Sequence, residues 1–267
     1  GSSWSSPTSA SGTNGELRHM VLKTSPKRDE AVLVTLGNNG RVEAQIWNGT
    51  TSSWGSVSTL CTTADVNVDR DLQSLYRWFD VEYEQSSGDA IVVCSDGTAD
   101  PNYYVWNGTA WSWPTDINIP NTGITNYIEL ASRPGTDELA MIVLDANVDV
   151  YGMRWTGSAW DAMGAAAVWD ATGSLATKKT IDVAFEKTSG DIMFAWWFAT
   201  AATAHFRYRA YSGAVLWAVT NVVNANQGWV VHWLELATNP TNASDQIMIW
   251  LVDAGSDLNT FIWSGTA

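Results

Sequence analysis

The chain contains 267 residues, with 28 Asp or Glu against 14 Lys or Arg, so its formal charge at pH 7 is −14. This acidic balance argues against a nucleic-acid partner, because binding to a phosphate backbone depends on clustered Lys and Arg. Hydrophobic residues make up 45% of the chain and charged residues only 16%, a composition that excludes intrinsic disorder.

A short motif recurs along the chain: an aromatic residue, a small polar residue, Gly and another small residue. The five copies begin at Trp47, Trp106, Trp155, Tyr211 and Trp263. The steps between them are 49 to 59 residues, a period typical of repeated supersecondary units. In the first four copies a second aromatic residue follows the turn, at Trp54, Trp111, Trp160 and Trp217.

Each unit predicts four strands. The first strand precedes a polar turn that ends in Asp, at Asp29, Asp89, Asp137, Asp191 and Asp245. The second is a short apolar run, at 31–36, 90–94, 139–144, 192–198 and 246–252. The third alternates apolar and polar residues before the aromatic–Gly turn, as residues 41–46 do, and the fourth carries the second aromatic residue. Gly suits these tight turns because it tolerates positive φ.

The fifth copy ends before its fourth strand. Residues 3–7 resemble the segment that follows the second turn, residues 111–114. We therefore expect the N-terminal strand to pair with the last three strands and to close a ring. Such closure would also remove the free sheet edges that promote aggregation.

Four strands per unit, five units and this closure predict an all-β, five-bladed β-propeller with four-stranded antiparallel blades. Over its whole length the chain resembles β-propeller repeat proteins, although it lacks a Trp-Asp pair at the end of each blade and the Asp-box pattern of sialidases. A large β-sandwich or two small β domains are the alternatives. We expect one domain, residues 1–267, with blades at 17–62, 76–120, 126–170, 180–224 and 230–267, the last completed by 1–10.

Four innermost strands carry an acidic residue in the same register: Asp80, Glu129, Asp182 and Glu235. One hypothesis is a cation or polar-ligand site in the central channel. The other is that each acid accepts hydrogen bonds from the adjacent blade, which we favour because a feature repeated in four blades is more often scaffold. A glycoside hydrolase would need an asymmetric acid–base pair, and no pair stands out, so we assign no catalytic residue.

Three hairpins between the second and third strands contain Asp-x-x-x-Asp. The residues are Asp96 and Asp100, Asp145 and Asp149, and Asp253 and Asp257. Paired loop carboxylates with backbone carbonyls are the oxygen ligands that Ca²⁺ prefers, so these are candidate calcium sites. The alternative is turn formation, because an Asp side chain caps backbone N–H groups.

The outer-strand tryptophans are candidate sugar contacts, because indole rings stack on the apolar faces of sugars. They are Trp4, Trp54, Trp111, Trp160 and Trp217. Alternatively, these rings fill the widening wedge between neighbouring blades.

Cys61 and Cys94 either form one disulfide or remain two buried thiols. No run approaches the ~18 apolar residues of a membrane-spanning helix, so we expect no membrane insertion. The acidic charge and the abundance of small polar residues and Trp are typical of extracellular or cell-surface proteins. We therefore predict a non-catalytic binding module for a carbohydrate or a surface protein. The alternatives are a glycoside hydrolase-like propeller that uses channel carboxylates, and a structural, self-assembling module.

Overall fold

The computed structural model describes residues 5–12, 15–63, 76–119, 123–165, 168–171, 178–198, 204–223, 230–241, 245–255 and 257–265. All regular secondary structure in these residues is β-strand, which confirms the all-β class. Within the same residues, no helix exists that is long and apolar enough to cross a membrane. The strands form five antiparallel sheets, which we number 1 to 5 in chain order.

Sheet 1 contains β1 (Leu17–Thr24), β2 (Glu30–Gly37), β3 (Arg41–Asn48), β4 (Ser53–Trp54) and β5 (Ser58–Thr62). Sheet 2 contains β6 (Phe79–Tyr83), β7 (Ala90–Cys94), β8 (Asn102–Trp106) and β9 (Thr115–Asp116). Sheet 3 contains β10 (Thr125–Ser132), β11 (Leu139–Asp145), β12 (Val150–Trp155) and β13 (Trp160–Asp161). Sheet 4 contains β14 (Ile181–Phe185), β15 (Ile192–Trp196), β16 (Ala204–Ser212), β17 (Val215–Leu216) and β18 (Thr220–Val223). Sheet 5 contains β19 (Val231–Thr238), β20 (Ile247–Asp253) and β21 (Leu258–Trp263).

Strands that follow one another in the chain pair with one another in space. Sheets 1 to 4 each contain a path of four antiparallel strands in chain order, as the repeat predicts. The additional strands β5 and β18 pair with the third strands of their sheets, β3 and β16. Tight hairpins therefore account for the pairing within each sheet.

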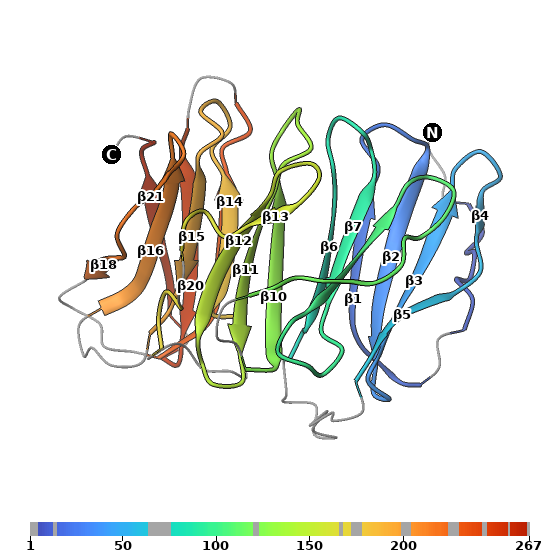
Figure 1. Cartoon of the computed structure of the whole chain (residues 1–267), viewed down its shortest axis with the longest axis horizontal. Helices are drawn as coiled ribbons and strands as arrows, with labels where there is room; N and C mark the ends of the chain where they lie inside the picture. The colour runs from blue at the N-terminus through green and yellow to red at the C-terminus, as the bar shows by residue number, and fades with distance from the viewer. Residues whose placement is uncertain are drawn as a thin grey trace.

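The sheets follow one another in chain order, from sheet 1 at the right of Figure 1 to sheets 4 and 5, which overlap in this view, at the left. The first strand of each sheet is the inner one and lies beside the first strand of the next: β1 beside β6, β6 beside β10, β10 beside β14, and β14 beside β19. Sheets 1 and 5 lie at opposite ends of this series (Figure 1).

The expected closing strand is not found in sheet 5. In the described residues this sheet has three strands, and residues 5–12 form no strand. Instead, the Ser11 backbone N–H donates to Gln45 Oε1 at 2.8 Å, and Gln45 Nε2 donates to the Ser11 carbonyl at 3.1 Å. The side-chain amide of Gln45 on β3 thus holds Ser11 of the N-terminal segment on sheet 1.

The core lies between the sheets. Each of four buried apolar clusters joins two neighbouring sheets; for example, Val34 and Leu36 of sheet 1 pack with Phe79 and Val92 of sheet 2. Because both faces of sheets 2, 3 and 4 are covered, β7 and β15 are continuous buried apolar runs, as is β11 up to its last residue, Asp145.

Two kinds of sheet alternate along the chain. The inner strands β1, β10 and β19 each have eight residues and a register irregularity near the start. The inner strands β6 and β14 each have five residues in regular register. We call sheets 1, 3 and 5 the odd sheets, and sheets 2 and 4 the even sheets.

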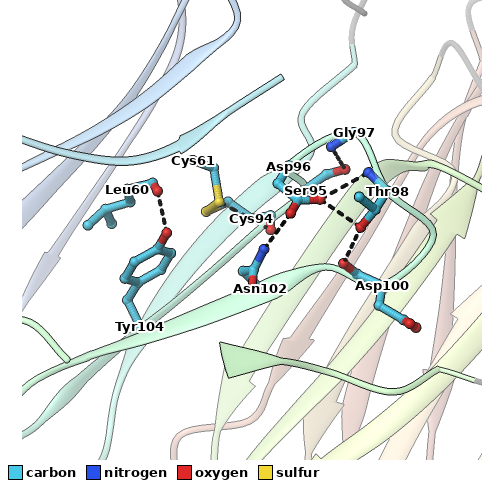
Figure 2. The surroundings of a disulfide bond; sticks show 10 residues. All are labelled: Leu60, Cys61, Cys94, Ser95, Asp96, Gly97, Thr98, Asp100, Asn102 and Tyr104. Atoms are coloured by element: carbon cyan, nitrogen blue, oxygen red, sulfur yellow. Dashed lines mark hydrogen bonds between the residues drawn. A yellow bond between two sulfur atoms is a disulfide. The ribbon is translucent and has the colours of Figure 1, made fainter. Parts of the chain in front are cut away.

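A disulfide joins Cys61 of β5 to Cys94 of β7, so the two cysteines are paired and cross-link sheets 1 and 2 (Figure 2). The Tyr104 hydroxyl, on the adjacent strand β8, donates to the carbonyl of Leu60 beside this bond. The cross-link and the hydrogen bond fix the outer strand of sheet 1 against sheet 2.

We predict that replacing both cysteines with Ser lowers the free energy of unfolding by about 3–4 kcal/mol, because the bridge closes a loop of 33 residues in the unfolded chain. The melting temperature should fall by about 10 °C. Calorimetry checks this on two samples, the double variant and the parent protein in reducing buffer. If both melt at the temperature of the oxidised parent protein, the prediction is wrong.

Candidate functional site

The inner strands of all five sheets line one central cavity of about 820 Å³. The four acids singled out from the sequence, Asp80, Glu129, Asp182 and Glu235, all line it. They share the cavity with cationic side chains, among them Lys23, Arg77 and Lys179.

Lys179 and Asp182 connect sheet 4 to sheet 5. Lys179 Nζ lies 3.2 Å from Asp182 Oδ2, and it donates to Glu235 Oε2 at 2.8 Å and to the Leu234 carbonyl at 3.1 Å. Asp182 Oδ2 also accepts the backbone N–H of Leu236 at 2.7 Å. One buried ion pair thus holds both side-chain and backbone groups of the next inner strand.

The same arrangement connects sheet 2 to sheet 3. Arg77 Nη2 donates to the Ile128 carbonyl at 3.2 Å and lies 2.5 Å from Glu129 Oε1. Asp80 Oδ2 accepts the backbone N–H of Leu130 at 2.8 Å. Asp80 and Asp182 therefore accept hydrogen bonds from the adjacent sheet, as the scaffold hypothesis expects. Glu129 and Glu235 instead form ion pairs with the cation of the preceding sheet.

Sequence reasoning missed the two cations. Each lies three residues before its acid, as Arg77-x-x-Asp80 and Lys179-x-x-Asp182. That shared spacing, present only before the acids of the even sheets, was the available signal.

The charged groups in the cavity shift one another's pKa values. Burial alone would lower the pKa of Lys179, but the carboxylates of Asp182, Glu129 and Glu235 outweigh it and raise that pKa above its usual range. Burial raises the pKa of Glu129 to about 8, against the opposing charges of Arg77 and Lys179. Because these carboxylates are held by cations and backbone N–H groups, the geometry favours a structural role for them.

The Asp-x-x-x-Asp hairpins use their first carboxylate within the turn. Asp145 Oδ1 accepts the backbone N–H groups of Asn147 and Asp149 at 2.8 and 2.9 Å. Asp253 Oδ1 accepts those of Gly255 and Asp257 at 2.9 and 3.0 Å. These contacts are the ones that the turn-forming alternative requires.

In the remaining hairpin, between β7 and β8, Asp96 accepts the Thr98 backbone N–H at 2.9 Å and the Asn102 side-chain amide at 2.8 Å (Figure 2). Asp100 accepts the Ile119 N–H at 3.0 Å. No group of three or more His, Cys, Asp or Glu side chains suited to a metal ion occurs among the described residues.

Three of the predicted tryptophans pack on the first aromatic residue of their own turn. The ring centroids are 5.4 Å apart for Trp54 and Trp47, 5.5 Å for Trp111 and Trp106, and 5.6 Å for Trp160 and Trp155. Trp111 and Trp160 also belong to the clusters with the preceding sheet, which is the wedge-filling arrangement. Trp4 lies outside the described residues.

Trp217 does not occupy the position equivalent to these residues. Tyr211 pairs with Leu216, as Trp106 pairs with Trp111, so the equivalent of Trp111 is Leu216. The spacing from the first aromatic residue is six in this copy and five in copies two and three. Since a one-residue shift turns a side chain to the other face of a strand, Trp217 faces the following sheet.

There Trp217 lines a cavity of about 210 Å³ between sheets 4 and 5. The opposite wall contains Trp263, which packs on Tyr208 with ring centroids 5.6 Å apart. The Trp263 indole N–H donates to Glu186 Oε1 at 2.5 Å, and the Ser189 hydroxyl donates to Glu186 Oε2 at 2.5 Å. The carboxylate thus fixes the second indole of the cavity.

Two polar groups of this cavity remain available to a ligand. The carboxylate of Asp191 and the hydroxyl of Ser212 line it, and neither has a hydrogen-bond partner among the described residues. At the matching junction of sheets 2 and 3, the position of Trp217 is occupied by Ser112. The two residues are equivalent because the Ser112 N–H donates to the Val105 carbonyl as the Trp217 N–H donates to the Ala210 carbonyl. Asp89 of sheet 2, the equivalent of Asp191, is engaged by Arg28 of sheet 1.

Comparison with known structures identifies the architecture. Over 93% of this chain and 74% of the other, the structure superposes with a TM-score of 0.57 on the six-bladed β-propeller lectin of Aleuria aurantia, at 13% sequence identity. With the BP39L lectin from Burkholderia pseudomallei the TM-score is 0.66 and the identity 10%, over 94% of this chain and 68% of that one. The fold is that of a β-propeller. No protein-family model and no curated protein sequence matches this propeller chain.

We predict that Lys179→Met destabilises the propeller by about 3–5 kcal/mol, because it leaves Asp182 and Glu235 without their shared cation. Urea unfolding measures the change. The control is Lys187→Met, a lysine of sheet 4 outside the observed ion pairs, and equal unfolding midpoints for the two variants would refute the prediction.

His19 of β1 also lines the central cavity. Burial, followed by the charges of Arg77 and Arg18, lowers its pKa from 6.5 to about 4. The folded propeller therefore binds fewer protons at this site than the unfolded chain between pH 6.5 and 4. The stability that His19 contributes is present above pH 6.5 and is lost as the pH falls through 4.

We expect His19→Gln to lose less stability than the parent between pH 7 and pH 4.5. From the two pKa values, the difference should amount to roughly 2–3 kcal/mol, or about 5–10 °C in melting temperature. Parallel pH-dependent melting curves for the two proteins would refute this assignment.

Proposed function

We propose that this propeller is a non-catalytic carbohydrate-binding module and that its binding site is the cavity between sheets 4 and 5. The observation that carries the proposal is the pair of indoles, Trp217 and Trp263, facing a cavity with an unpartnered carboxylate and an unpartnered hydroxyl. Indole rings pack on the apolar C–H face of a sugar, while Asp191 and Ser212 exchange hydrogen bonds with its hydroxyl groups.

The size of the cavity suits a small ligand. Its volume of about 210 Å³ is below the about 300–1,000 Å³ of pockets for drug-sized molecules, so a single sugar ring is the expected occupant. The conformation of Trp263 is fixed by Glu186 and Tyr208 before any ligand arrives. Such preorganisation lowers the entropy cost of binding.

Two further observations support the proposal. The structural neighbours are lectins, and that of Aleuria aurantia is described with a fucose recognition mode. We therefore propose a fucosylated glycan as the first ligand to test. The Cys61–Cys94 disulfide supports an extracellular or cell-surface location, because disulfides persist in oxidising compartments.

The hydrolase alternative would use the channel acids. Asp80 and Asp182 instead hold backbone N–H groups of the next sheet, and Glu129 and Glu235 contact the cations of the preceding one. The other alternative is a surface-protein ligand. A propeller that binds only protein would give no signal on a glycan array, so the same assay distinguishes the two.

The test is a glycan array followed by titration of tryptophan fluorescence with the sugars that bind. We expect Trp217→Ala to weaken binding at least about tenfold, or ~1.4 kcal/mol, because one wall of the cavity is lost. Trp217→Phe should retain part of the affinity, since an aromatic face remains.

The matched control is Trp54→Ala, which removes an outer-strand indole that packs on Trp47 of its own turn and does not line the cavity. This variant should bind like the parent. Sugar binding that depends on Trp54 and not on Trp217 would overturn the cavity assignment. The absence of sugar binding by the folded parent protein would overturn the proposed function.

A further inference from the structure

The polar contacts between neighbouring sheets are of two kinds, which depend on whether an even sheet precedes an odd one or the reverse. Where an even sheet precedes an odd one, an Asp of the odd sheet caps the turn of the even sheet. Asp137 Oδ1 accepts the N–H groups of Ser86 and Ser87 at 2.9 and 2.8 Å. Asp245 Oδ1 accepts those of Thr188 and Ser189 at 2.6 and 3.1 Å.

These even-to-odd junctions agree in their other contacts. A Trp of the odd sheet donates to a Glu of the even sheet, Trp155 to Glu84 at 2.6 Å and Trp263 to Glu186 at 2.5 Å. The Asp of the even inner strand accepts a backbone N–H from the odd one, as described above for the acids of the channel. The two junctions are therefore built in the same way.

Sheet 1 is odd, and it carries the same groups without their partners. Asp29 is the equivalent of Asp137, and Trp47 is the equivalent of Trp155. Within the described part of the chain, neither the Asp29 carboxylate nor the Trp47 indole N–H has a hydrogen-bond partner, and Asp29 is exposed.

The inner strand of sheet 1 is also uncovered. By the shared register irregularity, Met20 and Leu22 of β1 are equivalent to Ile128 and Leu130 of β10. Met20 is 71% and Leu22 57% exposed, whereas Ile128 and Leu130 are 0% and 6% exposed. The N-terminal segment covers this side of sheet 1 only farther out, where Ser11 meets Gln45 on β3.

At the other end of the series, the far face of sheet 5 is uncovered. In odd sheet 3, Ile142, Leu144 and Val150 are 0% exposed because they pack against even sheet 4. The equivalent residues of sheet 5 are exposed: Trp250 at 41%, Val252 at 36% and Leu258 at 70%. This apolar face has the pattern that an odd sheet presents to an even one.

We propose that these two surfaces bind one further sheet of the even kind, which follows sheet 5 and precedes sheet 1 around the channel. Two kinds of junction can alternate around a ring only if the number of sheets is even. Five sheets in a closed ring would place odd sheet 5 against odd sheet 1, where Asp29 meets no even turn.

The chemistry of the occupant follows from sheets 2 and 4. It is a four-stranded antiparallel sheet whose inner strand contains an Asp, is preceded by a cation three residues before that Asp, and is followed directly by a Glu. Its first turn offers two free N–H groups to Asp29. The comparison with the six-bladed lectin agrees with this arrangement, because 93% of this chain superposes on only 74% of that one.

The test extends the full chain with an even sheet of its own. A copy of residues 171–223 is fused after Ala267 through a flexible Gly-Ser linker, and a copy of residues 76–119 serves as a second even extension. We expect either copy to slow backbone hydrogen exchange in β1 and β21 on the order of tenfold and to raise the melting temperature.

The matched control is a copy of odd sheet 3, residues 123–165, with the same linker. It should leave exchange in β1 and β21 unchanged. In addition, Asp29→Asn should leave the melting temperature of the unextended chain unchanged but lower that of the extended chain, because Asp29 gains its turn partner only there.

Equal effects of the even and odd copies would overturn the proposal, as would unchanged exchange with both even copies. Sedimentation of the unextended chain completes the test. A dimer in which β20 and β21 are already protected would show that a second copy covers this face, which would also overturn the proposal.

Discussion

The arrangement of the sheets depends on buried carboxylates that reach from one inner strand to the next. Asp80 and Asp182 are 3% and 6% exposed, and each accepts a backbone N–H of the following sheet. An isolated charge in such a place would be very unfavourable, so each is accompanied by a cation that also contacts the following sheet. Apolar packing between the sheets is non-directional, whereas these hydrogen bonds and ion pairs fix how far one inner strand is shifted along its neighbour.

The position of the cavity between sheets 4 and 5 follows from that constraint. Glu186 belongs to the same even sheet as Asp182, and Trp263 belongs to the odd sheet that Asp182 contacts. Because the two sheets are held in register near the channel, Glu186 meets the Trp263 indole farther out. The cavity is therefore a property of the junction between two sheets, and neither sheet contains it alone.

The fold was largely predictable from turn chemistry, because the aromatic–Gly turns mark the end of the third strand in every copy. The acids of the channel were predictable from their register within the inner strands. The attachment of the N-terminus was not, since the bonds between Ser11 and Gln45 join residues 34 positions apart and leave no periodic signal. The pairing of Cys61 and Cys94 likewise depends on β5 lying against sheet 2, which no local pattern indicates.

The candidate site shows how little sequence separates the two roles of an indole in this architecture. Trp160 and Trp217 follow similar turns, but one residue of additional spacing places Trp217 on the opposite face. Moving a tryptophan by one position along the fourth strand, with the turn length unchanged, is therefore enough to turn a packing indole toward the cavity. Repeats of this kind can therefore gain or lose a cavity-lining indole through the position of one residue in the fourth strand, while the turns and the pairing of the strands stay the same.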